Sequence, residues 1–209
     1  MNPATVPSVF ETIRLPRGAV AVVRPVTAAD DGVERDFFAG LSDRSRFNRF
    51  HGVVNGLSDA MARYLAGADQ CLHVALVATV VEGGRETVIA DARYVACGDC
   101  AEFAIAVSDR FQGCGIAARL LDALATCALR AGLRWLVGDV LASNQAMLRF
   151  AERMGFARSN RARDDGIVRV ERALDASAPG RATRCSRLVR LVRSWLAPRC
   201  APQDMFVPF

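Results

Sequence analysis

The chain has 209 residues, of which 52% are hydrophobic and 23% are charged, a balance typical of a globular protein with one main core and not of a disordered chain. Its longest apolar run, Val74 to Val81, is far too short to span a bilayer and no secretory leader is recognisable, so we expect a cytoplasmic protein. The formal net charge of +5 comes from the segment after Asp175, which holds six arginines and one acid. The preceding part is formally neutral, so its charge gives no indication of a dedicated nucleic-acid site.

Hydrophobic periodicity predicts strands and helices that alternate along one α/β domain. The expected strands cover 18–26, two runs within 71–96 that form a hairpin joined at Gly83 and Gly84, 101–107, 133–141 and 167–174. The expected helices cover 28–41 with Thr27 as the cap, then 42–52, 57–67, 115–131 and 144–154. We divide the chain into an N-terminal segment 1–17, a domain with a single mixed central sheet flanked by helices over 18–175, and a tail over 176–209.

The sequence CGDC, Cys97 to Cys100, interrupts the strand region. A lone C-x-x-C with no second pair and no nearby histidine is weak evidence for a zinc or redox site. A turn between two strands is the preferred interpretation, and no metal site is expected.

The stretch DRFQGCGIAARLL, Asp109 to Leu121, places glycines between a strand and a helix. Backbone N–H groups at a helix N-terminus have no intrahelical partners and carry partial positive charge, so such a turn binds phosphate without a lysine. Gly113 and Gly115 let an anion approach where a Cβ would intrude. The turn alone does not identify the cofactor that carries the phosphate. GCGIAA matches the dinucleotide fingerprint G-x-G-x-x-A, with Asp139 as the distant acid, so a dinucleotide is one of two cofactor classes that fit.

Three features weigh against a dinucleotide. Five residues, SDRFQ, separate the strand from Gly113, whereas the fingerprint begins at the strand end. A hairpin precedes the motif, and too little chain follows it for a doubly wound sheet. The third feature is the downstream run SNQAMLRFAERMGF, Ser143 to Phe156, which points to a different family, as described next.

The stretch QGCGIA followed by Asn144 and MGF resembles the GCN5-related N-acetyltransferase (GNAT) superfamily, whose Q-x-x-G-x-G/A signature is met by Gln112, Gly115 and Ala117. The stretches RPVTAADDGVERDFFAGLSDRSRFNRFHG and NQAMLRFAERMGF are similar to the acetyltransferase domain of bacterial Pat-type protein lysine acetyltransferases. The resemblance implies a GNAT fold and acetyl-CoA as co-substrate in a cleft between two splayed parallel strands. The cofactor-binding residues it implies are Gln112, Gly113, Cys114, Gly115, Ile116 and Ala117 for the pyrophosphate, with Ile105, Ala106 and Val107 along the cofactor arm.

Glu102 matches the glutamate that Pat-type domains use as general base. An amine acceptor such as lysine, with a pKa of about 10.4, must lose a proton before it attacks a thioester. Apolar neighbours Phe103 and Ile105 favour a raised carboxyl pKa. Without the resemblance, a solvent-exposed strand glutamate would be the simpler interpretation.

Other residues carry weaker expectations. A backbone N–H near Ala106 or Val107 would stabilise the oxyanion that forms on the thioester. Asn144 would contact the cofactor arm, cap the following helix, or do both. Arg119 would reach a phosphate or remain solvated, and His51 and His73 are expected to have no catalytic role.

One position departs from the family. Ala151 stands where many members have a tyrosine that protonates the leaving thiolate, although Pat-type domains commonly lack this tyrosine and a thiol with a pKa of about 8.5 leaves without a dedicated acid. We expect an N-acetyltransferase that acts directly on a primary amine, with a protein lysine as the leading acceptor, as a monomer or homodimer. A small-molecule amine acetyltransferase and a non-catalytic acyl-CoA sensor remain as alternatives.

The tail contains a predicted amphipathic basic helix at about 185–197. On a helix with about 100° per residue, Arg187, Arg190 and Arg193 lie opposite an apolar face formed by Leu188, Val189, Leu191, Val192, Trp195 and Leu196. Such a helix docks on its own domain or contacts an anionic surface.

Overall fold

The computed structural model describes residues 10–54, 56–159 and 166–175. Its strands are β1 (Glu11–Arg14), β2 (Val20–Pro25), β3 (His73–Glu82), β4 (Arg85–Cys97), β5 (Cys100–Val107), β6 (Trp135–Leu141), β7 (Ala157–Arg158) and β8 (Ile167–Ala173). Its α-helices are α1 (Asp31–Gly40), α2 (Asp43–Phe50), α3 (Asp59–Ala66), α4 (Ile116–Arg130) and α5 (Gln145–Arg153), and short 3-10 helices cover Pro16–Gly18, Ala28–Asp30 and Asp109–Phe111. The predicted tail helix lies outside the described residues.

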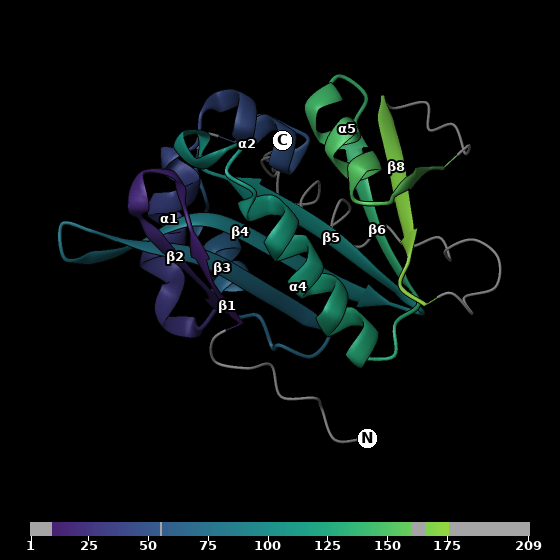
Figure 1. The fold of residues 1–209 in the computed structure, drawn as a ribbon, viewed down its shortest axis with the longest axis horizontal. Helices are drawn as coiled ribbons and strands as arrows, with labels where there is room; N and C mark the ends of the chain where they lie inside the picture. The colour runs from purple at the N-terminus through teal and green to yellow at the C-terminus, as the bar shows by residue number, and fades with distance from the viewer. Residues whose placement is uncertain (1–9, 55, 160–165, 176–209) are drawn as a thin grey trace, which may run out of the picture.

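All eight strands form one sheet in the order β1-β2-β3-β4-β5-β6-β8-β7 (Figure 1). Neighbouring strands are antiparallel except β5 and β6, which are parallel. The predicted mixed sheet is therefore confirmed. The dinucleotide alternative is wrong, because a doubly wound sheet is built mainly from parallel strands.

Two apolar cores cover the two faces of the sheet. One joins α4 and α5 to the sheet through residues such as Leu120, Leu124 and Leu148. The other packs α1, α2 and α3 through Phe38, Phe50 and other buried side chains. In Figure 1, α4 crosses the front of the sheet and α1 and α2 lie behind it. Along β5 the side chains alternate between these cores, so Phe103 belongs to the first and Ala106 to the second.

Turn chemistry explains several of the boundaries. Gly83 and Gly84, with φ of 57° and 78°, form the two-residue turn of the predicted hairpin between β3 and β4. The CGDC stretch forms the turn between β4 and β5, as preferred from the sequence. The backbone of Cys97 at the end of β4 lies opposite that of Cys100 at the start of β5. The β1 strand lies in the segment that sequence patterning left outside the domain, and it pairs with β2 at the sheet edge. No helix within the described residues is long and apolar enough to cross a membrane.

Candidate active site

The parallel strands β5 and β6 separate after a short paired stretch. Three residue pairs hold them together, ending with Glu102 opposite Val137. Beyond this point β5 pairs with β4 and β6 pairs with β8, so the sheet opens between them. This opening lies at the carboxyl ends of both strands, the usual location of a ligand site in an α/β sheet.

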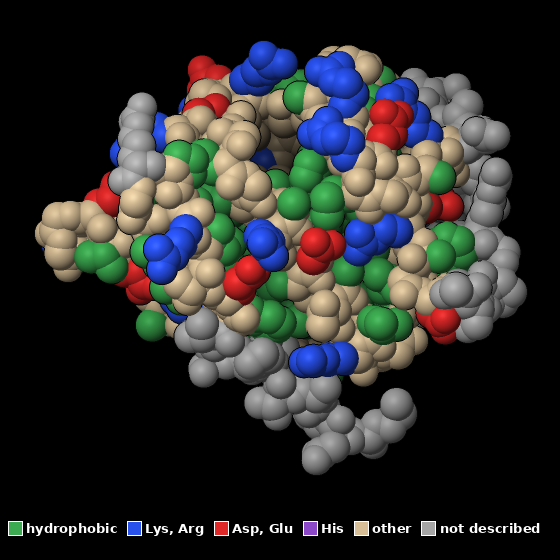
Figure 2. Space-filling model, viewed as in Figure 1, with side chains coloured by type: hydrophobic (Ala, Val, Ile, Leu, Met, Phe, Trp, Pro, Cys, Tyr) green, Lys and Arg blue, Asp and Glu red, His purple; other side chains and the backbone are tan. Residues whose placement is uncertain are grey.

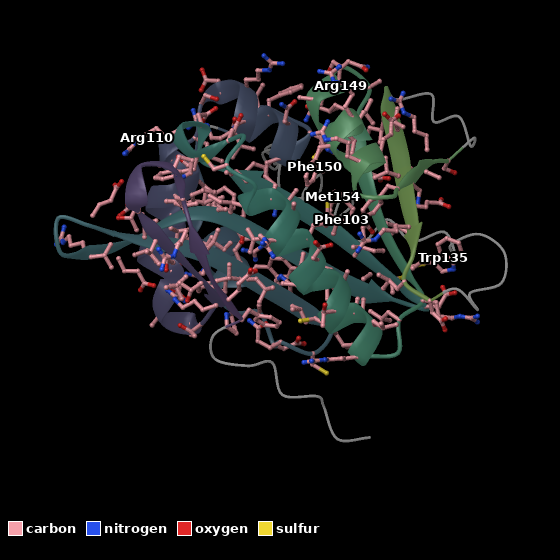
Figure 3. The ribbon with its side chains drawn as sticks, in the orientation of Figure 1. Phe103, Arg110, Trp135, Arg149, Phe150 and Met154 are labelled. Atoms are coloured by element: carbon pink, nitrogen blue, oxygen red, sulfur yellow. The ribbon has the colours of Figure 1, made fainter. Side chains whose placement is uncertain are left out.

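An aromatic ring fills the start of the opening. Gly138 is the first β6 residue beyond the paired stretch, and a Cβ added there would lie 2.6 Å from Cε1 of Phe103. The Phe103 ring also packs on Phe156, with ring centroids 5.3 Å apart. Phe150 of α5 and Met154, which caps its C-terminus, pack against the same core (Figure 3). Gly138 therefore makes room for the Phe103 ring at the point where the strands separate.

The backbone of β5 presents hydrogen-bonding groups to the opening. The Ser108 N–H donates to the Ile89 carbonyl at 2.8 Å, so Val107 and Ala90 form a non-hydrogen-bonded pair of the antiparallel ladder. The N–H and C=O of Val107, and by alternation those of Ile105, point away from β4. Of the two groups expected to stabilise an oxyanion, the Val107 N–H therefore points to the open side, whereas the Ala106 N–H points toward β4.

The glycine turn connects this strand to α4. Gly113 and Gly115 have φ of 77° and 82°, in the left-handed region that side-chain-bearing residues adopt only with strain. No atom lies within 4 Å of where a Cβ would be at either residue, so the backbone conformation is what requires glycine. Gly115 is the N-cap of α4, and the first N–H groups of this helix lack intrahelical acceptors.

Asp109 ties the glycine turn to α2. Its carboxylate accepts hydrogen bonds from the Ser42 N–H at 3.0 Å, the Ser42 hydroxyl at 2.9 Å and the Ser45 hydroxyl at 2.8 Å. Burial opposes its ionisation, but these bonds outweigh burial and lower the pKa of Asp109. The Gln112 side chain donates to the Ser45 hydroxyl at 3.3 Å and to the Val107 carbonyl at 3.2 Å. One carboxylate and one amide thus join the turn, β5 and α2.

A hollow lies at the strand opening. Figure 2 shows it in the upper part of the view, between the regions of α2 and α5. Its lining comes from α2 and its C-cap, from β5, and from β6 and α5: Asn48, Arg49, Phe50, His51, Glu102, Phe103, Ala104, Ile105, Asp139, Val140, Asn144 and Met147.

Glu102 lies where the strands separate and lines this hollow. The residue is 1% exposed, so the interpretation as a solvent-exposed strand glutamate is wrong. The Glu102 side chain shares a sheet face with Ala104 and Ala106, toward α1, α2 and α3. A carboxylate is therefore present at the one place where both strand edges and the hollow meet.

The other predicted residues divide into three groups. Ile105 and Asn144 line the hollow, and Asn144 also caps α5, since its side-chain oxygen accepts from the Met147 N–H at 3.1 Å. Ile116 is 1% exposed in the core, which leaves only its backbone available to a ligand. Arg119 is mainly exposed, and its Nη1 lies 3.1 Å from Glu11 of β1.

The wall of the hollow contributed by α2 was not resolved from the sequence. The stretch RSRFNRFHG entered the sequence analysis only as part of the family resemblance, and no feature distinguished Arg49 or His51 as a lining residue within it. His51 ends α2 in a left-handed conformation with φ of 54°, which is uncommon without glycine. Asp139 lines the hollow and pairs with Arg169 at 3.4 Å, whereas the sequence suggested it only for the dinucleotide alternative. Ala151, at the usual tyrosine position, is fully buried.

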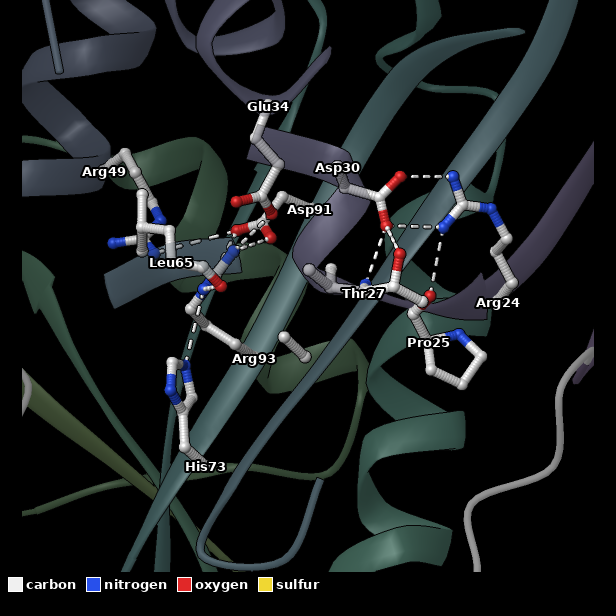
Figure 4. Close-up of polar contacts among 12 residues, drawn as sticks. Arg24, Pro25, Thr27, Asp30, Glu34, Arg49, Leu65, His73, Asp91 and Arg93 are labelled. Atoms are coloured by element: carbon white, nitrogen blue, oxygen red, sulfur yellow. Dashed lines mark hydrogen bonds and ion pairs between the residues drawn. The ribbon is translucent and has the colours of Figure 1, made fainter. Parts of the chain in front are cut away.

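A buried charge cluster lies behind the α2 wall (Figure 4). Arg93 of β4 donates to Asp91 through Nε at 3.1 Å and to Glu34 through Nη2 at 2.8 Å. Burial raises the pKa of Glu34 to about 7, although Arg93 opposes the change. Burial and the charge of Arg93 lower the pKa of His73 to about 4. The cluster reaches the hollow through Arg49, whose Nη2 lies 3.7 Å from Asp91.

A mixed sheet that opens at its parallel pair, with a glycine turn entering a helix beside a buried carboxylate, defines an acyltransferase of the GNAT fold. The chain belongs to the acetyltransferase (GNAT) family, whose model matches residues 49–156. It is an acyltransferase enzyme, which disfavours the non-catalytic alternative.

Named relatives and a solved structure agree with this assignment. Acetyltransferase PA5475 from Pseudomonas aeruginosa is 33% identical over 158 residues, which cover 74% of this chain and 84% of that protein. Acetyltransferase Pat from Mycolicibacterium smegmatis is 36% identical over 64% of this chain, but the match spans only 40% of that longer protein. The crystal structure of the GNAT domain of S. lividans PAT superposes with a TM-score of 0.72 at 31% identity, covering 78% of this chain and 96% of that one.

Proposed function

We propose that the enzyme transfers an acetyl group from acetyl-CoA directly to a primary amine, with a protein lysine as the acceptor. The observation that carries the proposal is the buried Glu102 carboxylate at the point where β5 and β6 separate. The likeness to the Pat acetyltransferases supports a lysine acceptor.

In this proposal Glu102 is the general base. A lysine amine is protonated at neutral pH, with a pKa of about 10.4, and Glu102 takes its proton directly or through water. The free amine nitrogen then attacks the thioester carbonyl carbon. The Val107 N–H donates to the oxygen as negative charge develops on it. The carbon–sulfur bond breaks and the acetyl group stays on nitrogen, which loses its surplus proton to become an amide. The departing CoA thiolate takes up that proton, directly or through water.

The glycine turn is proposed to bind the pyrophosphate of acetyl-CoA. The residues concerned are Gln112, Gly113, Cys114, Gly115, Ile116 and Ala117, which lead into the N-terminus of α4. The open space around Gly113 and Gly115 is consistent with this role. Ile105 and Asn144, which line the hollow, are proposed to contact the cofactor arm, and Arg119 would reach a phosphate only by leaving Glu11.

Replacement of Glu102 tests the chemical step. We expect Glu102→Gln to keep acetyl-CoA affinity, measured by calorimetry, and to lower the turnover of an accepted amine by about 100-fold or more. Higher pH should partly rescue the variant, because more acceptor is then deprotonated. Glu82→Gln, at the exposed end of β3, is the matched control. Wild-type turnover in Glu102→Gln would contradict the assignment.

The acceptor class is tested separately. Purified enzyme and isotope-labelled acetyl-CoA are added to bacterial lysate, and labelled lysines are identified by mass spectrometry. A panel of small amines is assayed in parallel. Label confined to small amines would favour the alternative acceptor class and contradict the protein lysine.

A further inference from the structure

A small apolar patch lies on the face of the sheet that α4 and α5 do not cover. It consists of Cys100 of β5 and Trp135 and Val137 of β6, which form a core of their own and are 0%, 9% and 0% exposed. The adjacent residues Ala101 and Leu136 belong to the core of α4 and α5, so strand alternation turns the three side chains to the opposite face. We call these three residues the β5–β6 patch.

No described helix contributes a side chain to the β5–β6 patch. The helices on this side of the sheet, α1, α2 and α3, pack on other sheet residues, such as Ala75, Val77 and Ala106. A tryptophan side chain buries roughly 150–250 Å² in a core, and most of this area would stay exposed on an uncovered sheet. Since a sheet buries its apolar face only against another layer, the patch requires a cover from outside the described residues.

The position of the β5–β6 patch indicates which part of the chain covers it. Residues 176–209 follow β8, and Ala173 at the end of β8 pairs with Trp135 of the patch. This segment therefore begins beside the patch. The other stretches outside the described residues join the fold elsewhere: 1–9 precede β1 at the opposite edge of the sheet, 160–165 enter β8 at its other end, and residue 55 separates α2 from α3.

A disulfide at the same row of the sheet gives independent evidence. Cys97, Cys100, Trp135 and Ala173 lie opposite one another across β4, β5, β6 and β8. Cys97 is disulfide-bonded, whereas the other described cysteines are free: Cys71, Cys100, Cys114 and Cys127. The two cysteines that remain in the chain, Cys185 and Cys200, both belong to 176–209.

Chain length allows this link. The ten residues from Asp175 to Cys185 reach up to about 33 Å when extended. The three strand spacings that separate β8 from β4 amount to only about 14 Å. A segment that starts at Asp175 can therefore cross the β5–β6 patch and reach Cys97 with either of its cysteines.

We propose that residues 176–209 dock on the β5–β6 patch of their own domain, with the predicted apolar helix face against Trp135 and Val137, and with a disulfide from Cys97 to Cys185 or Cys200. The arginines predicted on the opposite helix face stay in water. The disulfide forms when two thiols give two electrons and two protons to an oxidant such as glutathione disulfide, which becomes two molecules of glutathione.

This docking does not depend on the proposed reaction, but it has a consequence for the site. Val137 of the β5–β6 patch pairs with Glu102 across β5 and β6. A segment packed on Val137 therefore lies against the strand pair that carries the proposed base, on the same side of the sheet as the Glu102 side chain.

Fluorescence of Trp135 tests the apolar contact in the reduced full-length protein. The chain has two tryptophans, so Trp195→Phe leaves Trp135 as the only one. In this background, Leu188→Asp/Leu191→Asp should undock the segment and raise acrylamide quenching of Trp135 by at least about threefold, because a buried indole becomes exposed. The control Ser177→Asp/Ala182→Asp adds the same charge before the predicted helix and should leave quenching low. Equal quenching in the two variants overturns the docking.

Disulfide mapping tests where the segment lies. The full-length protein is oxidised with glutathione disulfide, digested without reduction and analysed by mass spectrometry. We expect Cys97 linked to Cys185 or Cys200. Cys114, a partly exposed thiol in the glycine turn, is the control. Tail cysteines that link to Cys114 as readily as to Cys97, or that do not link to Cys97 at all, overturn the placement.

Mixed isotopes separate docking within one chain from exchange between two copies. Equal amounts of ¹⁴N- and ¹⁵N-labelled protein are mixed, unfolded in reductant, refolded together and oxidised. We expect the linked peptides to carry a single isotope, because the segment docks on its own domain. Mixed-isotope pairs in statistical yield would assign the β5–β6 patch to the tail of a second copy and overturn the proposal.

Discussion

Gly138→Ala tests whether β6 needs glycine opposite the Phe103 ring, at the point where β5 and β6 separate. The new methyl group would lie 2.6 Å from Cε1 and 2.7 Å from Cζ of this ring, which real contacts do not allow, so the ring must move. Phe103 is 5% exposed and packs on Phe156. Overpacking of this kind costs about 1–3 kcal/mol. The lower entropy of the unfolded chain offsets about 0.4–1 kcal/mol.

We therefore expect Gly138→Ala to lower the free energy of unfolding by about 1–2 kcal/mol, or the melting temperature by roughly 2–8 °C. Gly32→Ala on α1 is the control, since no atom lies within 4 Å of its Cβ position and alanine favours a helix by about 1 kcal/mol. In the double variant Gly138→Ala/Phe103→Leu, the two changes should cost less than their sum, because the smaller side chain relieves the contact. Unchanged stability of Gly138→Ala, or strict additivity in the double variant, would refute the reasoning.

Two other predictions concern the glycine turn and the buried charges. Gly115→Ala and Gly132→Ala both place alanine at a positive φ, at opposite ends of α4, so both should lower stability. Only Gly115→Ala should weaken acetyl-CoA binding in calorimetry. Equal acetyl-CoA affinities of the two variants would remove the glycine turn from the cofactor site. The raised pKa of Glu34 stabilises the fold below about pH 4.5, and this effect is lost as the pH rises to about 7. The lowered pKa of His73 has the opposite dependence: it stabilises the fold above about pH 6.5, and this effect is lost as the pH falls to about 4. Relative to wild type, Glu34→Gln should therefore show stability that rises more steeply between pH 4.5 and 6.5, and His73→Gln stability that rises less, both measured by urea denaturation; parallel pH profiles would contradict both pKa shifts.

Local patterns predicted most of the elements. The β-branched runs on either side of Gly83 and Gly84 predict a hairpin with a two-residue turn, and β3 and β4 form that hairpin. The β1 strand was missed because its four residues, ETIR, alternate in burial at an edge and carry little apolar signal.

For the candidate site, the sequence offered hypotheses only where the residues concerned are close together in the chain. The glycine turn and Glu102 both lie within a single strand–turn–helix segment, and a family resemblance was sufficient to single them out. Arg49 could not be recognised in this way. Its burial in the wall of the hollow depends on contacts with Asp91 and Phe38, which folding brings together from distant parts of the chain. Sequence reasoning also expects charged residues such as Glu34 and Arg93 in solvent, whereas both are fully buried against each other.

The contacts of Asp109 have a consequence for how the two substrates affect each other. The same carboxylate accepts hydrogen bonds at the beginning of α2, a helix that lines the hollow, and lies beside Gln112 of the turn proposed to bind the cofactor. A ligand that ordered the turn would reduce the entropy that a second ligand must remove from α2, and such cooperativity would be reciprocal. Acceptor affinity measured without CoA would then describe a different, looser binding surface from the one on which the reaction takes place.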